Sequence, residues 1–256
     1  MTDDINPSHT AKTLSATNHI IALLPQLAGI VAGVSALGIF AGWREVSAYY
    51  SELGAPWVPE MLSPSRLMER SVGLMGTICL FTFLSVWWLS AKSVTESALR
   101  RASIVALVLA ALCYFTGIAP AHWFEKTTLY IFAILAAQLS AISVGLTIGE
   151  LIAGLAEREL KWNGYHVWLL YWIVFVSLLQ APNRLGTAKA EIDGAQDSTK
   201  LPIISATNAV PGRVWRLVTT IDSSFLAVSL GAQRKEHVFR VFSASEITDI
   251  KSSHAK

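Results

Sequence analysis

Charged residues are scarce in this sequence, and long stretches contain none. Asp, Glu, Lys and Arg make up 15% of the 256 residues, whereas a soluble globular domain contains about a quarter. None of the four occurs in residues 71–91, 127–149 or 162–183. Uncharged apolar stretches of about 20 residues match the thickness of the hydrocarbon core of a bilayer. The composition therefore excludes an ordinary soluble protein and predicts one that is embedded in a membrane.

Motifs that would identify a reaction are absent as well. The sequence has no HExxH, GxSxG, P-loop or GxGxxG motif, and its six histidines lack the paired spacing of metal ligands. No tract of basic residues points to nucleic acid. We therefore expect no enzymatic activity, no cofactor, no metal site and no nucleic-acid partner.

Five apolar stretches predict five transmembrane helices, at residues 20–42, 71–91, 102–120, 127–155 and 162–182. They form a predicted all-α membrane bundle over residues 20–182, which a polar segment at 1–19 precedes and a loop at 43–63 interrupts. Tryptophans cluster near the ends of these stretches, as in the aromatic belts of membrane proteins: Trp43, Trp87, Trp88, Trp123 and Trp162. The lipid bilayer is thus the first predicted partner of the chain.

An odd number of spans places the two termini on opposite sides of the membrane. Lys and Arg residues near the spans divide six against six between the sides, which leaves the orientation open under the positive-inside rule. The second and fourth loops concentrate their positive charge in short connectors, which favours a cytoplasmic N-terminus. We expect a multi-pass protein of the cell (inner) membrane whose C-terminal domain lies on the side opposite the cytoplasm.

The C-terminal part has a different pattern. Residues 183–200 are small and polar, and they indicate a linker or an extension of the fifth helix. Short β-branched and aromatic stretches then follow one another between turn-like segments, at residues 201–205, 214–221, 225–230, 237–243 and 247–251. They predict a small all-β domain over residues 201–256. An SH3-like or OB-like barrel is the economical fold, because closure removes exposed sheet edges.

Small residues recur at spacing four in two of the predicted helices. The fourth span contains an unbroken series of six, and the first contains two GxxxG pairs: Ala133, Ala137, Ala141, Gly145, Gly149 and Ala153; Gly29 with Gly33, and Gly38 with Gly42. Such series let helix backbones approach closely in lipid, where no hydrophobic effect drives association. Two interpretations stay open: packing of these two helices on each other within one chain, and formation of a homo-oligomer through the same face.

Glu150 is the one carboxylate that the span boundaries leave ambiguous. A charge at bilayer depth is costly and usually functional. Residues 127–149 already cover about 34 Å at 1.5 Å per residue, which would place Glu150 at the interface. If the span extends toward residue 156 instead, Glu150 is the candidate for proton or cation coupling.

Aromatic residues in the first loop favour a role in recognition. Tyr49, Tyr50 and Trp57 are the predicted contacts, since aromatic side chains are favoured anchors of protein interfaces. We therefore expect a non-enzymatic membrane protein, of the immunity or accessory type, that binds a protein partner through its β domain and first loop. The alternatives are a small transporter or channel, or a subunit of one, with Glu150 as coupling carboxylate, and a membrane-embedded enzyme.

Overall fold

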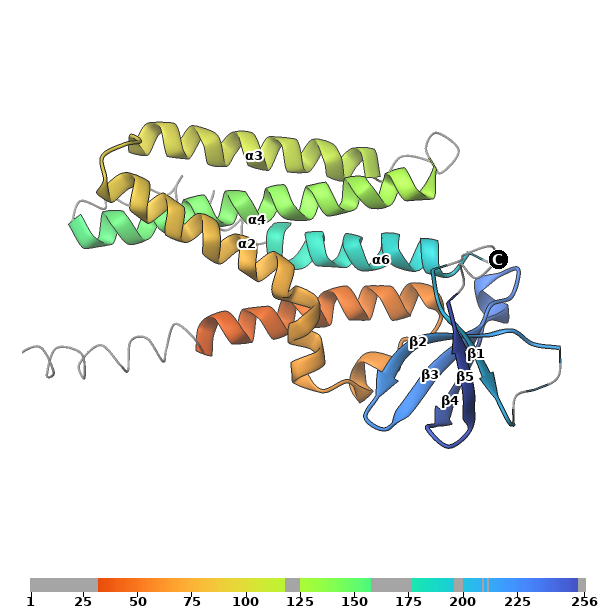
Figure 1. Cartoon of the computed structure of the whole chain (residues 1–256). Helices are drawn as coiled ribbons and strands as arrows, with labels where there is room; N and C mark the ends of the chain where they lie inside the picture. Colours follow the sequence, from red (N-terminus) through yellow and green to blue (C-terminus); the bar gives the residue numbers. More distant parts are fainter. Residues whose placement is uncertain are drawn as a thin grey trace, which may run out of the picture.

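The computed structural model of the chain describes residues 32–117, 125–157, 176–195, 200–208, 210 and 212–252. These residues form five α-helices and a five-stranded antiparallel sheet. The sheet lies at one end of the helical part (Figure 1). The protein is therefore mostly helical with a C-terminal β domain, as predicted.

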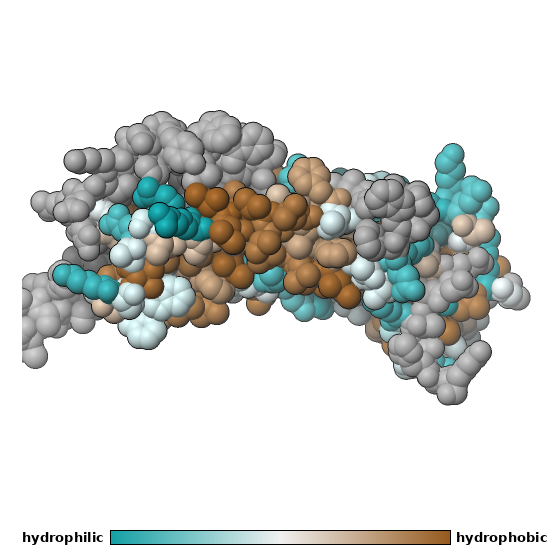
Figure 2. Space-filling view, turned by 90° about the horizontal axis from the view of Figure 1, so that it is seen from above, coloured by the Kyte–Doolittle hydropathy of each residue, from teal (hydrophilic) through white to brown (hydrophobic). Residues whose placement is uncertain are grey.

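Three helices are long and apolar enough to cross a membrane: α2 (Pro64–Ser90), α3 (Glu96–Gly117) and α4 (Lys126–Glu157). Their outward faces are strongly apolar, and Leu80, Phe83 and Phe115 are exposed to 54%, 67% and 70%. Figure 2 shows hydrophobic residues gathered in a broad band across the middle of the molecule. Large exposed apolar surfaces mark membrane contact, so these helices confirm the prediction of a membrane protein. They coincide with the second, third and fourth predicted spans.

The first and fifth predicted spans fall partly outside the described residues, at 20–31 and 162–175. The polar segment at 1–19 lies outside them altogether. Where the first span is described, a helix covers residues 32–53, and we call it the 32–53 helix. Most of the predicted loop at 43–63 is therefore helical. Residues 43–53 belong to this helix, and η1 (Val58–Met61) follows as a short 3-10 helix. The helix continues past position 42 because it packs there against α2, α6 and the sheet.

Of the two alternatives for residues 183–200, a linker or an extension of the fifth helix, the described part shows the helix. A π-helical turn, η2 (Val176–Gln180), leads into α6 (Ala181–Asp193), so residues 183–193 form a helix. Pro182 lies in the first turn of α6, where a missing N–H is tolerated. Small buried residues then bring α6 close to the 32–53 helix: a Cβ at Gly186 would collide with the carbonyl oxygen of Glu45. The extension of the fifth predicted helix is thus packed, although its composition is that of a linker.

The β domain consists of β1 (Ile203–Ala206), β2 (Trp215–Ile221), β3 (Ser224–Ser229), β4 (Val238–Ser243) and β5 (Ile247–Lys251). Their order in the sheet is β4-β3-β2-β1-β5, and every neighbouring pair is antiparallel. Trp215 and Phe242 stack edge to face in its core, with ring centroids 5.4 Å apart. The antiparallel β character is confirmed, whereas the closed SH3-like or OB-like barrel stays a prediction.

Two small residues of α4, Gly145 and Gly149, pack against α2, whereas the sequence predicted the first helix as their neighbour. A Cβ on Gly145 would lie 2.6 Å from the carbonyl oxygen of Ile78, and one on Gly149 would lie 2.8 Å from that of Thr82. The earlier members of the series are buried, namely Ala133, Ala137 and Ala141, and Ala153 is half-buried.

The glycines of the 32–53 helix also face α2. A Cβ on Gly42 would collide with the carbonyl of Leu67, and one on Gly38 would lie 3.3 Å from the Ser71 hydroxyl. Gly33 has no neighbour within 4 Å among the described residues, and Gly29 lies outside them. Both helices thus approach α2 and meet its backbone at different points along its length. A homo-oligomer through the same faces stays a prediction.

The close approach at Gly145 predicts the effect of adding one methyl group there. Gly145→Ala should lower the yield and melting temperature of the detergent-purified protein, because overpacking costs about 1–3 kcal/mol. Gly76→Ala is the matched control in α2: a Cβ added at this glycine would meet no other part of the described chain within 4 Å, and alanine favours a helix by about 1 kcal/mol over glycine. Equal melting temperatures for the two variants would contradict the α2–α4 contact.

Candidate functional site

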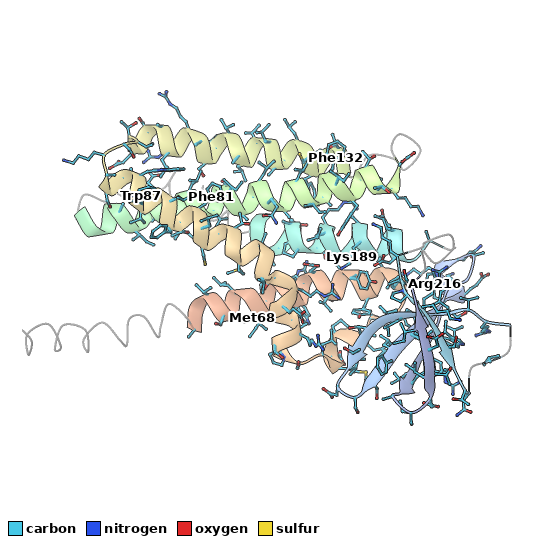
Figure 3. The ribbon with its side chains drawn as sticks, viewed as in Figure 1. Met68, Phe81, Trp87, Phe132, Lys189 and Arg216 are labelled. Carbon is cyan, nitrogen blue, oxygen red and sulfur yellow. The ribbon has the colours of Figure 1, made fainter. Side chains whose placement is uncertain are left out.

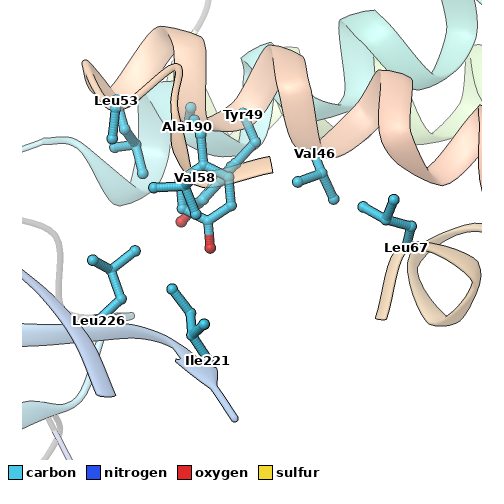
Figure 4. Close-up of a cluster of buried hydrophobic side chains, with 10 residues drawn as sticks. Val46, Tyr49, Leu53, Val58, Leu67, Ala190, Ile221 and Leu226 are labelled. Atoms are coloured by element: carbon cyan, nitrogen blue, oxygen red, sulfur yellow. The ribbon is translucent and has the colours of Figure 1, made fainter. Parts of the chain in front are cut away.

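The β domain is fixed to the helical part by one hydrophobic cluster, which we call the docking core (Figure 4). The 32–53 helix and the segment after it contribute Tyr50, Leu53 and Val58, which are exposed to 2% or less. The sheet contributes Ile221 and Leu226. The remaining members come from the 32–53 helix, the following segment, α2 and α6: Val46, Tyr49, Ala55, Leu67 and Ala190.

Two of the three aromatic residues predicted to bind a partner belong to this core. Tyr49 and Tyr50 are exposed to only 7% and 2%, whereas Trp57 is exposed to 41%. The prediction that Tyr49 and Tyr50 form an exposed recognition surface is wrong. They lie on a continuing helix, where they pack edge to face with ring centroids 5.0 Å apart, and the sheet of the same chain covers them.

Polar contacts accompany the docking core. The Tyr49 hydroxyl donates a hydrogen bond of 3.0 Å to the Asp193 carboxylate at the end of α6. On the β domain, the His237 ring lies 2.9 Å, through Nδ1, from the carbonyl oxygen of Leu53. An ion pair of 3.5 Å joins Arg234 to Glu52. The sheet is therefore attached to the 32–53 helix by both apolar and polar contacts.

Beside the docking core lies a cleft of about 350 Å³, which we call the charged cleft. The 32–53 helix supplies Glu45 and the two tyrosines to its lining, and β2 supplies Thr219. Cations reach it from two further helices: Arg66 and Arg70 from α2, and Lys189 from α6. Lys189 lies on α6 beside the 32–53 helix (Figure 3). One more carboxylate, Glu69, pairs with Arg66 at 3.2 Å.

Burial changes the ionisation of the groups in and behind this cleft. It raises the pKa of the Glu45 carboxyl, and the positive charges of Lys189 and Arg70 offset only part of that shift. It also raises the pKa of Asp193, against the opposing effects of the hydrogen bond from Tyr49 and the charge of Lys189. The pKa of Lys189 is lowered by burial first and then by repulsion from Arg70.

The two tyrosines remain neutral at physiological pH. Burial raises the pKa of Tyr50 to about 12. Burial and the neighbouring Asp193 charge raise the pKa of Tyr49 well above its ordinary value. Both hydroxyls therefore stay protonated and able to donate hydrogen bonds.

Glu150, the predicted coupling residue, lies far along α4 from this site and pairs with Arg100 near the start of α3. Arg100 Nε donates a hydrogen bond of 3.0 Å to the Glu150 carboxylate. The pair joins the end of α4 to the beginning of α3, so Glu150 has a cationic partner at the helix ends. Among the predicted helix-packing residues that the structure describes, Gly38, Gly42, Gly145 and Gly149 face α2, and none of the described ones lines the charged cleft.

Sequence reasoning missed Glu45, Arg70, Lys189 and Asp193. The spacing of four could have indicated that these residues face one site. It places Glu45 and Tyr49 on one helix face, and Lys189 and Asp193 on another. Recognising it required residues 43–53 and 183–193 to be read as helices. Their polar composition indicated a loop at 43–53 and left a linker open beside a helix extension at 183–193.

The raised pKa of Glu45 predicts a pH-dependent stability. A carboxyl whose pKa is higher in the folded than in the unfolded protein stabilises the fold at acidic pH, and this contribution is lost as the pH rises through the folded pKa. The wild-type melting temperature in detergent should therefore rise as the pH is lowered from neutral toward the ordinary carboxyl pKa of 4.5. Glu45→Gln, which is neutral throughout, should flatten that rise and melt at least as high as wild type at neutral pH.

The exposed Glu60 provides the control, and Glu60→Gln should keep the wild-type pH profile. If Glu45→Gln leaves the pH dependence of the melting temperature unchanged, the inference that burial raises the pKa of Glu45 is wrong.

The chain matches no family model, no curated protein and no solved structure. Two features of its own structure bear on its function. The docking core holds the β domain in one position, and the cleft beside it is lined by charged groups from several elements.

Proposed function

We propose that the protein is a non-enzymatic, multi-pass membrane protein that binds a protein partner through its β domain. The observation that carries this proposal is the difference between the two edges of the sheet. β4 lies at one edge and β5 at the other. An edge strand offers a row of backbone hydrogen-bonding groups to an added strand, and proteins usually protect such edges with charge.

The β5 edge carries that protection. Asp249 and Lys251 form an ion pair of 3.3 Å on its exposed surface. The β4 edge is more apolar, since Val238 and Val241 are exposed to 37% and 41%. Arg240 is the one charged residue in β4, and its guanidinium is directed to the Asn208 carbonyl and the Glu246 carboxylate of the same domain. β4 is therefore the better candidate for strand addition by a partner.

The docking core supports the same proposal. A binding domain that is already fixed in place loses less conformational freedom when its partner binds. Trp57 keeps its proposed role as an additional anchor, because it is exposed to 41%. Its neighbours Tyr49 and Tyr50 act indirectly, by holding the β domain on the 32–53 helix.

The finer points of the membrane arrangement belong to the proposal as well. We place the chain in the cell (inner) membrane with five spans and a cytoplasmic N-terminus. The β domain, as a small SH3-like or OB-like barrel that stays open between its β4 and β5 edges, then lies on the opposite side. The transporter or channel alternative has weaker support, since Glu150, its coupling candidate, is engaged by Arg100. Among the described residues, no constellation of side chains favours the enzyme alternative.

Site-specific photo-crosslinking in native membranes tests the proposal. A photoreactive phenylalanine replaces Val241 on β4 in one variant and Ile250 on β5 in the other. Ile250 is the matched control because it is an apolar residue on the opposite edge and is exposed to 46%. We expect a discrete protein adduct from position 241 that position 250 does not give.

Adding the substitution Val238→Lys to the first variant should reduce that adduct, because a charge on the edge opposes strand addition. The absence of an adduct at position 241, or equal adducts at both positions, would contradict recognition through β4.

A further inference from the structure

We propose that the charged cleft binds a phosphate group, and that this group belongs to the headgroup of a phospholipid at the membrane surface. This inference is independent of the proposed protein partner, since the cleft lies between α2, α6, the 32–53 helix and β2 and does not include β4.

The charge of the lining favours one anionic group. Arg66 and Glu69 neutralise each other through their ion pair of 3.2 Å. Arg70 and Lys189 then face a single further lining carboxylate, that of Glu45. Asp193 stands behind this lining, where it accepts the Tyr49 hydroxyl and where the positive charge of Lys200 offsets its own. A phosphodiester with one negative charge would balance the excess cation and relieve the repulsion between Arg70 and Lys189.

The donors of the cleft suit phosphate oxygens. An arginine guanidinium binds a phosphate through two parallel N–H groups, and a lysine ammonium binds it as a compact charge. Thr219 and Tyr50 add hydroxyl groups to the lining. The volume of about 350 Å³ accommodates a phosphate together with the small alcohol that it esterifies.

Its position along α2 points to a lipid as the source. Arg66 and Arg70 occupy the first two turns of α2, and residues 71–91 after them contain no charge. The two arginines therefore lie where the apolar part of the span begins, at the depth of lipid headgroups. Met68 and Val72, on the same helix, are exposed to 39% and 59%. Met68 lies on this part of α2 (Figure 3), and the two exposed side chains offer an apolar surface for the acyl chains.

Binding of phosphatidylglycerol to the full-length, delipidated protein in detergent tests the proposal. Native mass spectrometry gives the dissociation constant for this lipid, and a parallel titration uses glycerol 3-phosphate as the water-soluble probe. We expect Arg70→Gln and Lys189→Gln each to weaken phosphatidylglycerol binding about tenfold, the loss of one charge-assisted contact. Arg70→Lys should retain part of the affinity.

The control is Arg101→Gln, which removes an exposed cation at the opposite end of the membrane helices and should leave the affinity unchanged. Circular dichroism and size-exclusion profiles verify that each variant is folded. Equal affinity of wild type, Arg70→Gln and Lys189→Gln for phosphatidylglycerol would overturn the proposal. If glycerol 3-phosphate binds as tightly and depends on the same two residues, the cleft is a phosphate site but the lipid source is wrong.

Discussion

Burial of the apolar side of the 32–53 helix is the interaction on which the position of the β domain depends. Leu53 and Val58 are buried, and exposing either side chain to water would lower the stability of the fold by roughly 1.5–3 kcal/mol. The sheet covers these side chains with Ile221 and Leu226, which fixes the β domain on the helical part. The same packing brings α6 against the 32–53 helix and so places Lys189 beside Glu45 in one cleft.

Close approach of backbones to α2 organises the helical half. Gly42 meets the carbonyl of Leu67 in the first turns of α2, and Gly145 meets that of Ile78 further along. In lipid such contacts rest on dispersion and weak Cα–H···O interactions, which require glycine or alanine at the contact. α2 is therefore the element that links the membrane helices to the docking core, since Leu67 belongs to that core as well.

The sequence predicted those features that depend on the residues of one short stretch. The uncharged stretch at 71–91 and the short β-branched stretches after residue 201 suffice to identify a span and a β domain. The contacts between distant elements were not predictable in the same way. The small residues of α4 indicate a close helix neighbour, but they do not show that this neighbour is α2. The burial of Tyr49 and Tyr50 depends on a sheet about 170 residues later in the chain, and α6 is stabilised by packing that its linker-like composition conceals. Sequence reasoning therefore found the helix contact and the β domain but missed the charged cleft.

The central claim is that contacts of the docking core, and not the chain connection, hold the β domain on the helical part. Inserting a protease site between residues 195 and 200 and cleaving the purified protein in mild detergent tests this directly. If the claim is correct, the C-terminal fragment stays bound and co-elutes with the membrane fragment until Leu226→Asp is introduced to disrupt the core. Release of the wild-type fragment into the soluble fraction on cleavage would contradict it.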